Sequence, residues 1–595
     1  MVENKNLILA IALSIVIVLG FEFLVNKPRL DRERAQQAER QAATQTMPTA
    51  PSQAPTGAQA PATQTNVPAA PGAPAATTPA TPPVVDRAGL IAQQQRIRID
   101  TPAMSGSIVL KGARIDDLKL NHYRETVDRN SPAIILLTPQ GVQHSYFAQF
   151  GWVGPQGVAV PDDNTEWTAD QRTLTLSTPV TLSWDNGQGL RFERKIALDG
   201  EYMFSVTDRV LNSGSAAVQL FPYGLVARDG LPHTQGFYIL HEGPLAVMDG
   251  TLREPSYADL KTKQKIEFET TGGWLGFTDK YWLVTLVPDQ KAAVKARFNH
   301  SLFNGDDRFQ ADYLGAAMSA APGGTIEATN RVFAGAKELN LLTYYQDKLG
   351  ITKFDLAIDF GWFYFLTKPI FLILDYFYRL IGNYGLAILL LTVLVKLIFF
   401  PLANKSYKAM NKMKLLQPEM EKLKAKYGDD RQKMSTEMMA LYKRVGANPL
   451  AGCLPVVIQI PVFFALYKVL FISIEMRHAP FFGWIHDLSA PDPTSVFNLF
   501  GLLPWAPPEL HFIAGTIGAW PLIMGVTMFM QQKMNPAPPD PVQAKIFLAM
   551  PVIFTFILAP FASGLVIYWA WNNTLSVLQQ WVILRQMKAH PVPAK

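Results

Sequence analysis

Cysteine and charge are what this chain has least of. Its one cysteine, Cys453, excludes a disulfide within the chain, and no zinc or redox cysteine spacing is present. Only 17% of the 595 residues are charged, whereas 49% are hydrophobic, and the hydrophobic excess lies near the C-terminus. The net charge of +6 is small for this length, so its distribution is more informative than its total. This composition indicates a membrane part joined to a soluble part.

Residues 41–85 contain no charged and no aromatic side chain, and consist mostly of Ala, Pro, Thr and Gln. Such a composition cannot bury enough apolar surface to offset its ordering entropy. We therefore expect residues 26–85 to form a disordered linker. Residues 7–25 carry one charge, Glu22, and lack an A-x-A cleavage site, so residues 1–25 are predicted to be a retained transmembrane anchor.

Residues 86–345 alternate between apolar and polar side chains, as in VTLSW at 180–184 and LRFE at 190–193, with a DNG turn between them. Many short strands with turn signals predict a large all-β sandwich. The domain contains no nucleophile elbow, phosphate loop or metal-ligand spacing. We interpret its histidines as surface or internally satisfied residues; these are His122, His144, His233, His241 and His300.

Residues 346–380 are predicted to form a connector and an amphipathic helix that lies in the membrane interface. Aromatic residues cluster beside Lys368 and Pro369, with sparse charges around them. The alternative is that this segment extends the next helix at its N-terminus. Pro369 favours a break between the two.

Long stretches of the C-terminal half carry almost no charge. Residues 546–584 have none, and as one helix these 39 residues would be ~58 Å long, about twice the membrane core. We therefore expect two spans there, separated near Pro560 and Ser563. Together with the anchor, the chain is predicted to have six spans, the last five at about 381–401, 449–474, 512–530, 546–561 and 565–584.

One full charge, Lys396, lies within the span predicted at 381–401. A charge at that depth costs a few kcal/mol or more, so it usually faces a partner, a cavity or water. The alternative is that Lys396 extends to the cytoplasmic headgroups, because it lies only five residues before Pro401. The sequence leaves both interpretations open.

The segment 405–444 is strongly basic, with 11 Lys or Arg residues against 5 Asp or Glu. Met and Leu recur at spacings of three and four on both sides of Gly428, which predicts an antiparallel helical hairpin over 404–448 with a Met-rich seam. Its basic face is predicted to bind anionic lipid or ribosomal RNA. By contrast, residues 475–511 contain one Arg and four acidic residues.

This contrast sets the orientation, because basic loops stay on the cytoplasmic side. We expect the hairpin to be cytoplasmic and the 475–511 loop to lie outside. Counting spans back from there places the β domain outside and the N-terminus inside, although basic residues follow the anchor. The core ends at 588, and the tail, 589–595, is predicted to be cytoplasmic.

Short motifs in a fixed order identify a resemblance. They are Asn383-Tyr384-Gly385, Lys396, Pro401-Leu402, Met413 to Pro418, NPLAGCLP at 448–455, Gln459-Ile460-Pro461, WIHDL at 484–488 and Ser563-Gly564-Leu565. On these residues the chain resembles the YidC family of bacterial membrane-protein insertases, in its Gram-negative form and over essentially its whole length. The resemblance implies a multi-pass protein of the bacterial inner membrane, with a periplasmic β domain of the mutarotase-like supersandwich type. It also implies five core helices around a polar groove open to cytoplasm and lipid.

The resemblance places particular residues in the groove. Many members have Arg where this chain has Lys396, which keeps the charge but loses the planar fork. The predicted groove residues are Lys396, Thr392, Gln459, Phe463, Tyr568, Trp569 and Asn572, and the predicted hairpin contacts are Lys422, Lys424 and Lys426. An extra stretch at about 497–520, compared with shorter members, has no assigned function.

The resemblance implies an insertase and chaperone that acts on nascent membrane proteins, alone or with the Sec translocon. Membrane lipids, the ribosome and a targeting receptor are the other expected partners, without DNA, cofactor, metal or catalytic residue. One alternative is a secondary transporter or channel, but no internal repeat is visible. The other is a membrane-anchored, carbohydrate-acting protein, which would need a carboxylate pair in the β domain.

Overall fold

The computed structural model describes residues 86–232, 234, 240–361, 363–427, 430–445, 454–503, 517–535 and 541–589. The chain divides into two compact units, and the larger, Pro68–Ala537 with Leu548–Lys595, contains nearly all of these residues. The predicted anchor and linker lie outside the described residues, and so does the tail except for Ala589. His233 and Cys453 lie outside them as well.

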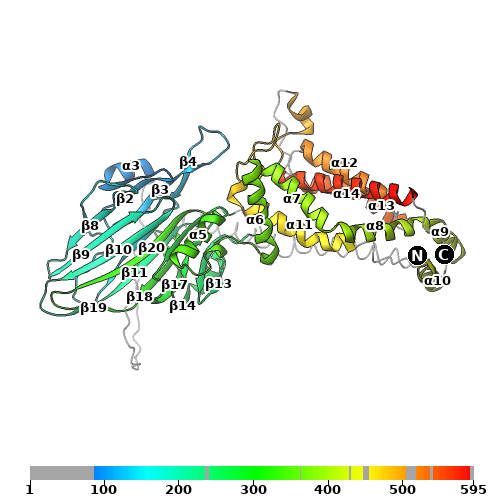
Figure 1. Cartoon of the computed structure of the whole chain (residues 1–595). Helices are drawn as coiled ribbons and strands as arrows, with labels where there is room; N and C mark the ends of the chain where they lie inside the picture. The colour runs from blue at the N-terminus through cyan, green and yellow to red at the C-terminus, as the bar shows by residue number, and fades with distance from the viewer. Residues whose placement is uncertain are drawn as a thin grey trace, which may run out of the picture. The chain divides into compact units, whose positions relative to one another are not determined.

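Two large sheets form the β domain, as the alternating sequence predicts, and Figure 1 shows their strands side by side. Nearly all pairings are antiparallel; β1 and β7 pair in parallel. In spatial order, the first sheet contains β14 (Lys265–Thr271), β17 (Ala293–Phe303), β18 (Asp306–Gly315), β11 (Val218–Asp229), β5 (Tyr146–Val153), β3 (Arg114–Arg124), β2 (Met104–Val109), β1 (Arg96–Asp100) and β7 (Thr173–Leu174), with β19 (Met318–Ala320) on β11 and β4 (Ala133–Leu137) on β3. The second contains β13 (Thr251–Arg253), β12 (Gly243–Met248), β15 (Trp274–Thr278), β16 (Trp282–Val287), β20 (Thr325–Ala336), β10 (Met203–Asn212), β9 (Leu190–Leu198), β8 (Val180–Asp185) and β6 (Thr168–Ala169).

The period-two pattern reflects burial of one face of each strand. Along β9 every second residue is buried, including Phe192 and Ile196. The predicted turn between β8 and β9 is present, with Gly187 at a φ of 69°. Two short helices, α3 (Arg87–Gln93) and α4 (Tyr257–Lys263), accompany the sheets.

A helical connector follows β20. It consists of α5 (Leu339–Leu349), the 3-10 turn η2 (Phe354–Ala357) and α6 (Tyr364–Ile381). The break predicted at Pro369 is wrong, because Pro369 lies inside α6. The helix ends instead at Gly382, whose left-handed φ of 75° suits glycine. Segment α6 is therefore a separate helix rather than an extension of the next one, as predicted.

The remaining helices are α7 (Tyr384–Ile398), α8 (Phe400–Leu415), α9 (Gln417–Tyr427), α10 (Arg431–Val445), α11 (Leu454–Ile472), α12 (Ala519–Met534), α13 (Pro541–Leu558) and α14 (Ser563–Ala589) (Figure 1). Short 3-10 turns, η4 (Ile474–Met476) and η5 (Val496–Gly501), lie between α11 and α12. The uncharged run at 546–584 divides between α13 and α14 near Pro560, as predicted.

The predicted span at 381–401 does not form one straight helix. Segment α7 ends at Ile398, and the chain bends by 68° before α8. Among the described residues no single helix has both the length and the apolar composition needed to cross a bilayer. In that part of the chain, only the bent pair Tyr384–Ile398 and Phe400–Met410, taken together, is long and apolar enough. The six spans remain a prediction.

The predicted cytoplasmic hairpin is formed by α9 and α10, while α8 precedes it as a third helix. The Met-rich seam is present between α9 and α10. Its buried members are Leu416, Met420, Leu441 and Tyr442, with Met413, Leu423 and Met438 packed against them. The seam therefore joins the two helices to each other.

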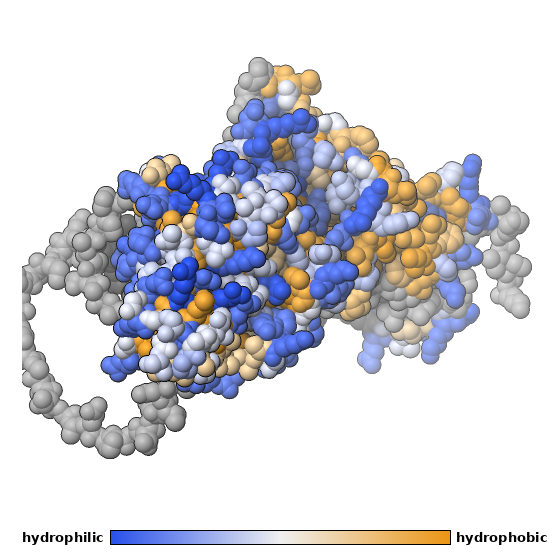
Figure 2. All heavy atoms as spheres, turned by 60° about the vertical axis from the view of Figure 1, so that its left-hand side comes forward, coloured by the Kyte–Doolittle hydropathy of each residue, from blue (hydrophilic) through white to orange (hydrophobic). Residues whose placement is uncertain are grey.

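Hydrophobic side chains gather on the helical region in Figure 2, whereas the visible face of the β domain is mainly hydrophilic. Exposed apolar residues on these helices include Leu397, Phe464, Val526, Val552 and Trp581. Apolar surface on this scale marks a region that contacts lipid or another protein.

Candidate functional site

The start of α7 is fixed by the motif Asn383-Tyr384-Gly385. The side chain of Asn383 caps the helix by accepting a hydrogen bond from the backbone N–H of Leu386, 3.0 Å away. The Tyr384 ring stacks on Tyr378 of α6, with centroids 3.7 Å apart. Gly385 is packed so closely against Phe481 that a Cβ would lie 2.0 Å from its ring. Each residue of the motif thus has a structural role in setting where α7 begins.

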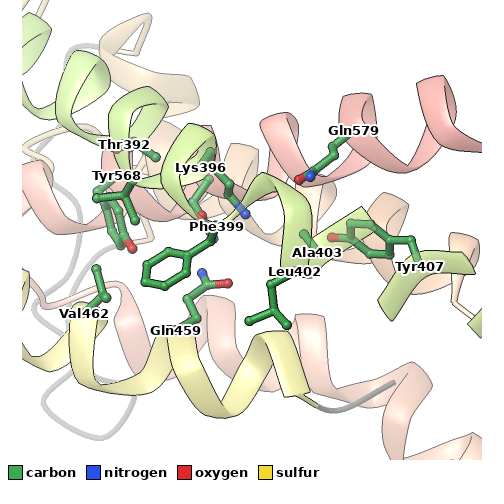
Figure 3. Close-up of a pocket in the computed structure, with 12 residues that line it drawn as sticks. Thr392, Lys396, Phe399, Leu402, Ala403, Tyr407, Gln459, Val462, Tyr568 and Gln579 are labelled. Atoms are coloured by element: carbon green, nitrogen blue, oxygen red, sulfur yellow. The ribbon is translucent and has the colours of Figure 1, made fainter. Parts of the chain in front are cut away.

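Three turns along α7, Lys396 lies in a cavity between α7, α8, α11 and α14 (Figure 3). The cavity has about 590 Å³ of empty space and is partly open. It is lined by Thr392, Val395, Lys396, Phe399, Leu402, Ala403, Tyr407, Gln459, Val462, Tyr568, Asn572 and Gln579. Amide, hydroxyl and ammonium groups thus share one space with apolar side chains.

The ammonium group of Lys396 is held by a hydroxyl rather than by a carboxylate. Its Nζ donates a hydrogen bond to Ser576 Oγ, 2.7 Å away. Among the described residues no Asp or Glu forms an ion pair with Lys396. The cavity therefore contains a cation whose counter-ion is not supplied by the described part of the chain.

Four of the predicted groove residues share this cavity with Lys396. Thr392 is buried, and its hydroxyl donates to the backbone oxygen of Ile388 at 2.7 Å. Tyr568 of α14 and Gln459 of α11 line the cavity from two different helices. Asn572 is also buried on the cavity wall. Figure 3 shows Lys396, Gln459 and Tyr568 directed into the same space.

Two predicted groove residues, Phe463 and Trp569, do not line the cavity. Their rings stack on each other at 4.5 Å with an interplanar angle of 20°. Phe463 is one residue beyond Val462 on α11, and Trp569 is one beyond Tyr568 on α14, so each points away from the wall that its neighbour forms. These two aromatics pack the α11–α14 contact instead.

The sequence did not predict several residues of the site. Ser576, which accepts the Lys396 hydrogen bond, lies four residues after Asn572 on α14, so the helical spacing could have identified it. Tyr407 and Leu402 belong to α8, and they reach the cavity because of the 68° bend after α7. No motif in the sequence predicts that angle.

A second hollow lies between the hairpin helices α9 and α10. It is lined by Glu419, Lys422, Leu423, Lys426, Glu437, Ala440, Leu441 and Arg444, with about 730 Å³ of empty space. Lys422 and Lys426 therefore border the hollow, whereas Lys424 does not line it; all three are exposed. Arg444 pairs with Glu419 at 3.3 Å. Charge on this element is therefore largely solvent-facing.

The β domain offers no comparable site among the residues that the structure describes. No group of three His, Cys, Asp or Glu side chains there could hold a metal ion. His241 contacts the backbone oxygen of Pro244 at 2.8 Å, and burial lowers the pKa of its imidazole. His300 pairs with Asp307 at 2.9 Å. These two histidines are internally satisfied, as predicted.

Comparisons with known proteins cover nearly the whole chain. The family described as YidC periplasmic domain matches residues 96–373, and the family described as 60Kd inner membrane protein matches residues 376–590. A membrane protein insertase YidC of Methylobacterium radiotolerans is 50% identical over 98% of this chain and 95% of its own length. That of Bradyrhizobium diazoefficiens is 50% identical over 98% and 97%. A crystal structure of an active YidC insertase is 18% identical, covers 82% of this chain and 92% of its own, and has a TM-score of 0.35.

Proposed function

This chain belongs to the YidC family of membrane protein insertases, and on that premise we propose that the cavity around Lys396 receives the charged part of an entering client. The protein acts on nascent membrane proteins, and its family consists of bacterial inner membrane proteins with a periplasmic domain. The finer features below, from the site residues to the topology, are our proposal.

One observation carries the proposal: Lys396 is enclosed by helices and has no acidic partner among the described residues. A lysine kept only to stabilise the bundle would be expected to have its charge neutralised by a carboxylate. An unneutralised ammonium group in a partly dry cavity attracts a carboxylate strongly, because attraction grows as the local dielectric constant falls. The acidic residues of a translocated tail supply such carboxylates.

The rest of the cavity wall suits the same task. A charged segment cannot cross hydrocarbon unaided, and a polar, hydrated space lowers that barrier by shortening the dry path. Gln459, Tyr568 and Asn572 offer hydrogen-bonding groups there, while Phe399 and Val462 keep part of the wall apolar. A segment that enters the cavity therefore finds polar partners without being held tightly, and an apolar span is free to leave sideways into lipid.

We further propose six spans, with the N-terminus and the hairpin α9–α10 in the cytoplasm and the β domain in the periplasm. The basis is the contrast between the basic hairpin and the acidic 475–511 loop. On the cytoplasmic side, Lys422, Lys424 and Lys426 would contact anionic lipid, the ribosome or a targeting receptor, with the Sec translocon as an additional partner for some clients. In this proposal the protein has no enzymatic activity.

The test compares variants of Lys396 with pairs of clients that differ only in the charge of the translocated tail. Lys396→Arg should retain insertion of both clients. Lys396→Ala should lower insertion of the acidic-tail client about tenfold, which corresponds to ~1.4 kcal/mol of lost attraction, and Lys396→Glu should lower it further. The neutral-tail client should be affected less, since water in the cavity still lowers its barrier.

Insertion is measured as protease protection of the translocated tail, with the amount of each variant in the membrane checked in parallel. Equal insertion of the acidic-tail client by Lys396→Ala and the parent would show that Lys396 is not a receptor. In that case the lysine would only extend to the headgroups, which was the alternative that the sequence left open.

A further inference from the structure

We infer that Ser576 is a positioning residue that holds the Lys396 ammonium group inside the cavity. The inference rests on the proposed function and names the group that makes Lys396 available to a client. It begins with the hydrogen bond from Lys396 Nζ to Ser576 Oγ, which at 2.7 Å joins α7 to α14.

The proton of the Ser576 hydroxyl is already committed within α14. Its hydroxyl donates that one proton to the backbone oxygen of Asn572, 2.8 Å away. Because a serine hydroxyl has one proton and two acceptor sites, Lys396 must be the donor of the bond between them. The Ser576 oxygen is thus an acceptor on α14 that holds the ammonium group of α7.

Gln580, one turn after Ser576 on α14, makes a second buried bond, because its Nε2 donates to Asn535 Oδ1 at 2.9 Å. Ser576 and Gln580 are 1% and 5% exposed, so water competes weakly for these bonds. Helix α14 is therefore bonded to α7 through Lys396 and to the C-terminal cap of α12 through Asn535.

The hydrogen bond to Ser576 matters because a lysine side chain is long and mobile. Segment α7 ends at Ile398, only two residues after Lys396, so a free side chain would extend towards the end of the helix and the headgroups. The bond to Ser576 uses one of the three N–H donors of the ammonium group. Two donors remain for a client carboxylate, and the neutral hydroxyl leaves the positive charge uncompensated.

A carboxylate at position 576 would position the lysine equally well but would neutralise it. A hydroxyl holds the group without cancelling its charge, so position and charge are both kept.

The first measurement is the reactivity of Lys396 itself. Reductive methylation of the purified full chain in nanodiscs, followed by mass spectrometry, gives a rate for each lysine, with the exposed Lys422 as internal reference. Ser576→Ala should raise the methylation rate of Lys396 several-fold. Ser576→Thr keeps the hydroxyl and should leave the rate unchanged.

Thr574→Ala is the matched control. Thr574 lies on the same helix and makes the same kind of bond, from its hydroxyl to the backbone oxygen of Ala570 at 2.8 Å, but the Lys396 ammonium group donates to Ser576 instead. Its removal should change neither the reactivity of Lys396 nor insertion. An equal effect of Thr574→Ala would mean that loss of any such hydroxyl disturbs α14.

The second measurement is insertion of the paired clients. Ser576→Ala should lower insertion of the acidic-tail client about tenfold, the scale of one hydrogen bond to a charged group, and should change the neutral-tail client less than twofold. In a Lys396→Ala background, Ser576→Ala should have no further effect, because a positioning residue acts only through the group that it positions.

The outcomes separate this inference from the proposed function. If Lys396→Ala lowers acidic-tail insertion and Ser576→Ala changes neither insertion nor reactivity, the positioning role is wrong and the receptor role stands. If Lys396→Ala has no effect, the proposed function is wrong. Equal losses for both clients, additive with Lys396→Ala, would show that Ser576 serves only to hold the helices together. Should Ser576→Ala fail to accumulate, Ser576→Cys provides the same comparisons, because a thiol fills a similar volume but is only a weak acceptor.

Discussion

Two lysines lie within the predicted spans of the helical core, and their surroundings differ. Lys468 of α11 forms an ion pair with Asp359 at 2.8 Å, so its charge is neutralised within the fold. Lys396 of α7 is bonded to the hydroxyl of Ser576, with no carboxylate partner among the described residues. The contrast separates a structural cation from one that is available to a client.

A buried carboxyl group gives a pH-dependent prediction at the same scale. Burial raises the pKa of Glu475 to about 8, and the nearby Glu338 and Asp375 add to the shift. Its Oε1 accepts a long hydrogen bond from the backbone N–H of Leu339, 3.4 Å away, while Oε2 is buried and has no hydrogen-bond partner in the described part of the chain. Because the folded pKa exceeds the unfolded value, the folded state binds more protons between pH ~4.5 and ~8, and stability falls as pH rises through that range.

We therefore predict that Glu475→Gln, which mimics the neutral acid, is more stable than the parent at pH 9 by about 1–3 kcal/mol and close to it at pH 4.5. The measurement is thermal unfolding of both proteins in nanodiscs at several pH values. A difference that is the same at every pH would show that Glu475 does not titrate in this range.

Residue types and helical spacing were enough to predict part of the site. Thr392 and Lys396 are one turn apart, as are Tyr568 and Asn572, and all four line the cavity. Spacing alone does not predict the direction in which a side chain points at a helix–helix contact. Trp569, next to Tyr568, was therefore predicted to lie in the groove, whereas it packs on Phe463.

At the scale of the element, the hairpin α9–α10 presents charge to solvent and hides a small apolar seam. Replacing Lys422, Lys424 and Lys426 by Glu changes the charge of this face by six units. We expect at least tenfold weaker binding to vesicles containing anionic lipid, because each basic residue near such a surface contributes ~1 kcal/mol. Ribosome binding, measured by cosedimentation, should weaken as well.

The core should keep its thermal stability in this variant, since the three lysines are exposed and the seam is untouched. The matched control replaces the same lysines by Arg, which keeps the charge and should retain binding. If both vesicle and ribosome binding were unaltered by the Glu replacements, the basic face would be only a solvated surface.

Proline was a poor guide to where helices end in this chain. Pro369 lies inside α6, Pro401 lies in the first turn of α8, and Pro461 and Pro551 lie inside α11 and α13. In helices packed against others, neighbouring groups satisfy the backbone that proline leaves without a partner, so the local signal is overridden. The glycine at 382, with its positive φ, marks the true break.

For the whole molecule, the composition and the spacing of apolar residues predicted the division into a β domain and a helical region. Both signals are local, because they come from strands that bury one face and from helices that carry no charge. The pairing order of the strands is not local: β7 pairs with β1, and β11 lies between β5 and β18. Likewise, the cavity joins residues from α7, α8, α11 and α14, which are up to 187 positions apart from Thr392 to Gln579. Only the fold brings them together.

The central claim is that a client's translocated segment enters the cavity around Lys396, and site-specific photocrosslinking tests it most directly. Val462 and Phe464 are two residues apart on α11, so they point to nearly opposite sides of the helix. Val462 lines the cavity, whereas Phe464 is 48% exposed on the outer surface and lines no part of it.

A photoreactive phenylalanine analogue is placed at each position in turn, and a ribosome-stalled client with an acidic tail is presented to the membrane. The account predicts several-fold more crosslinking from position 462 than from position 464, and loss of that excess in a Lys396→Glu background. Equal crosslinking from the two positions, or more from position 464, would contradict it.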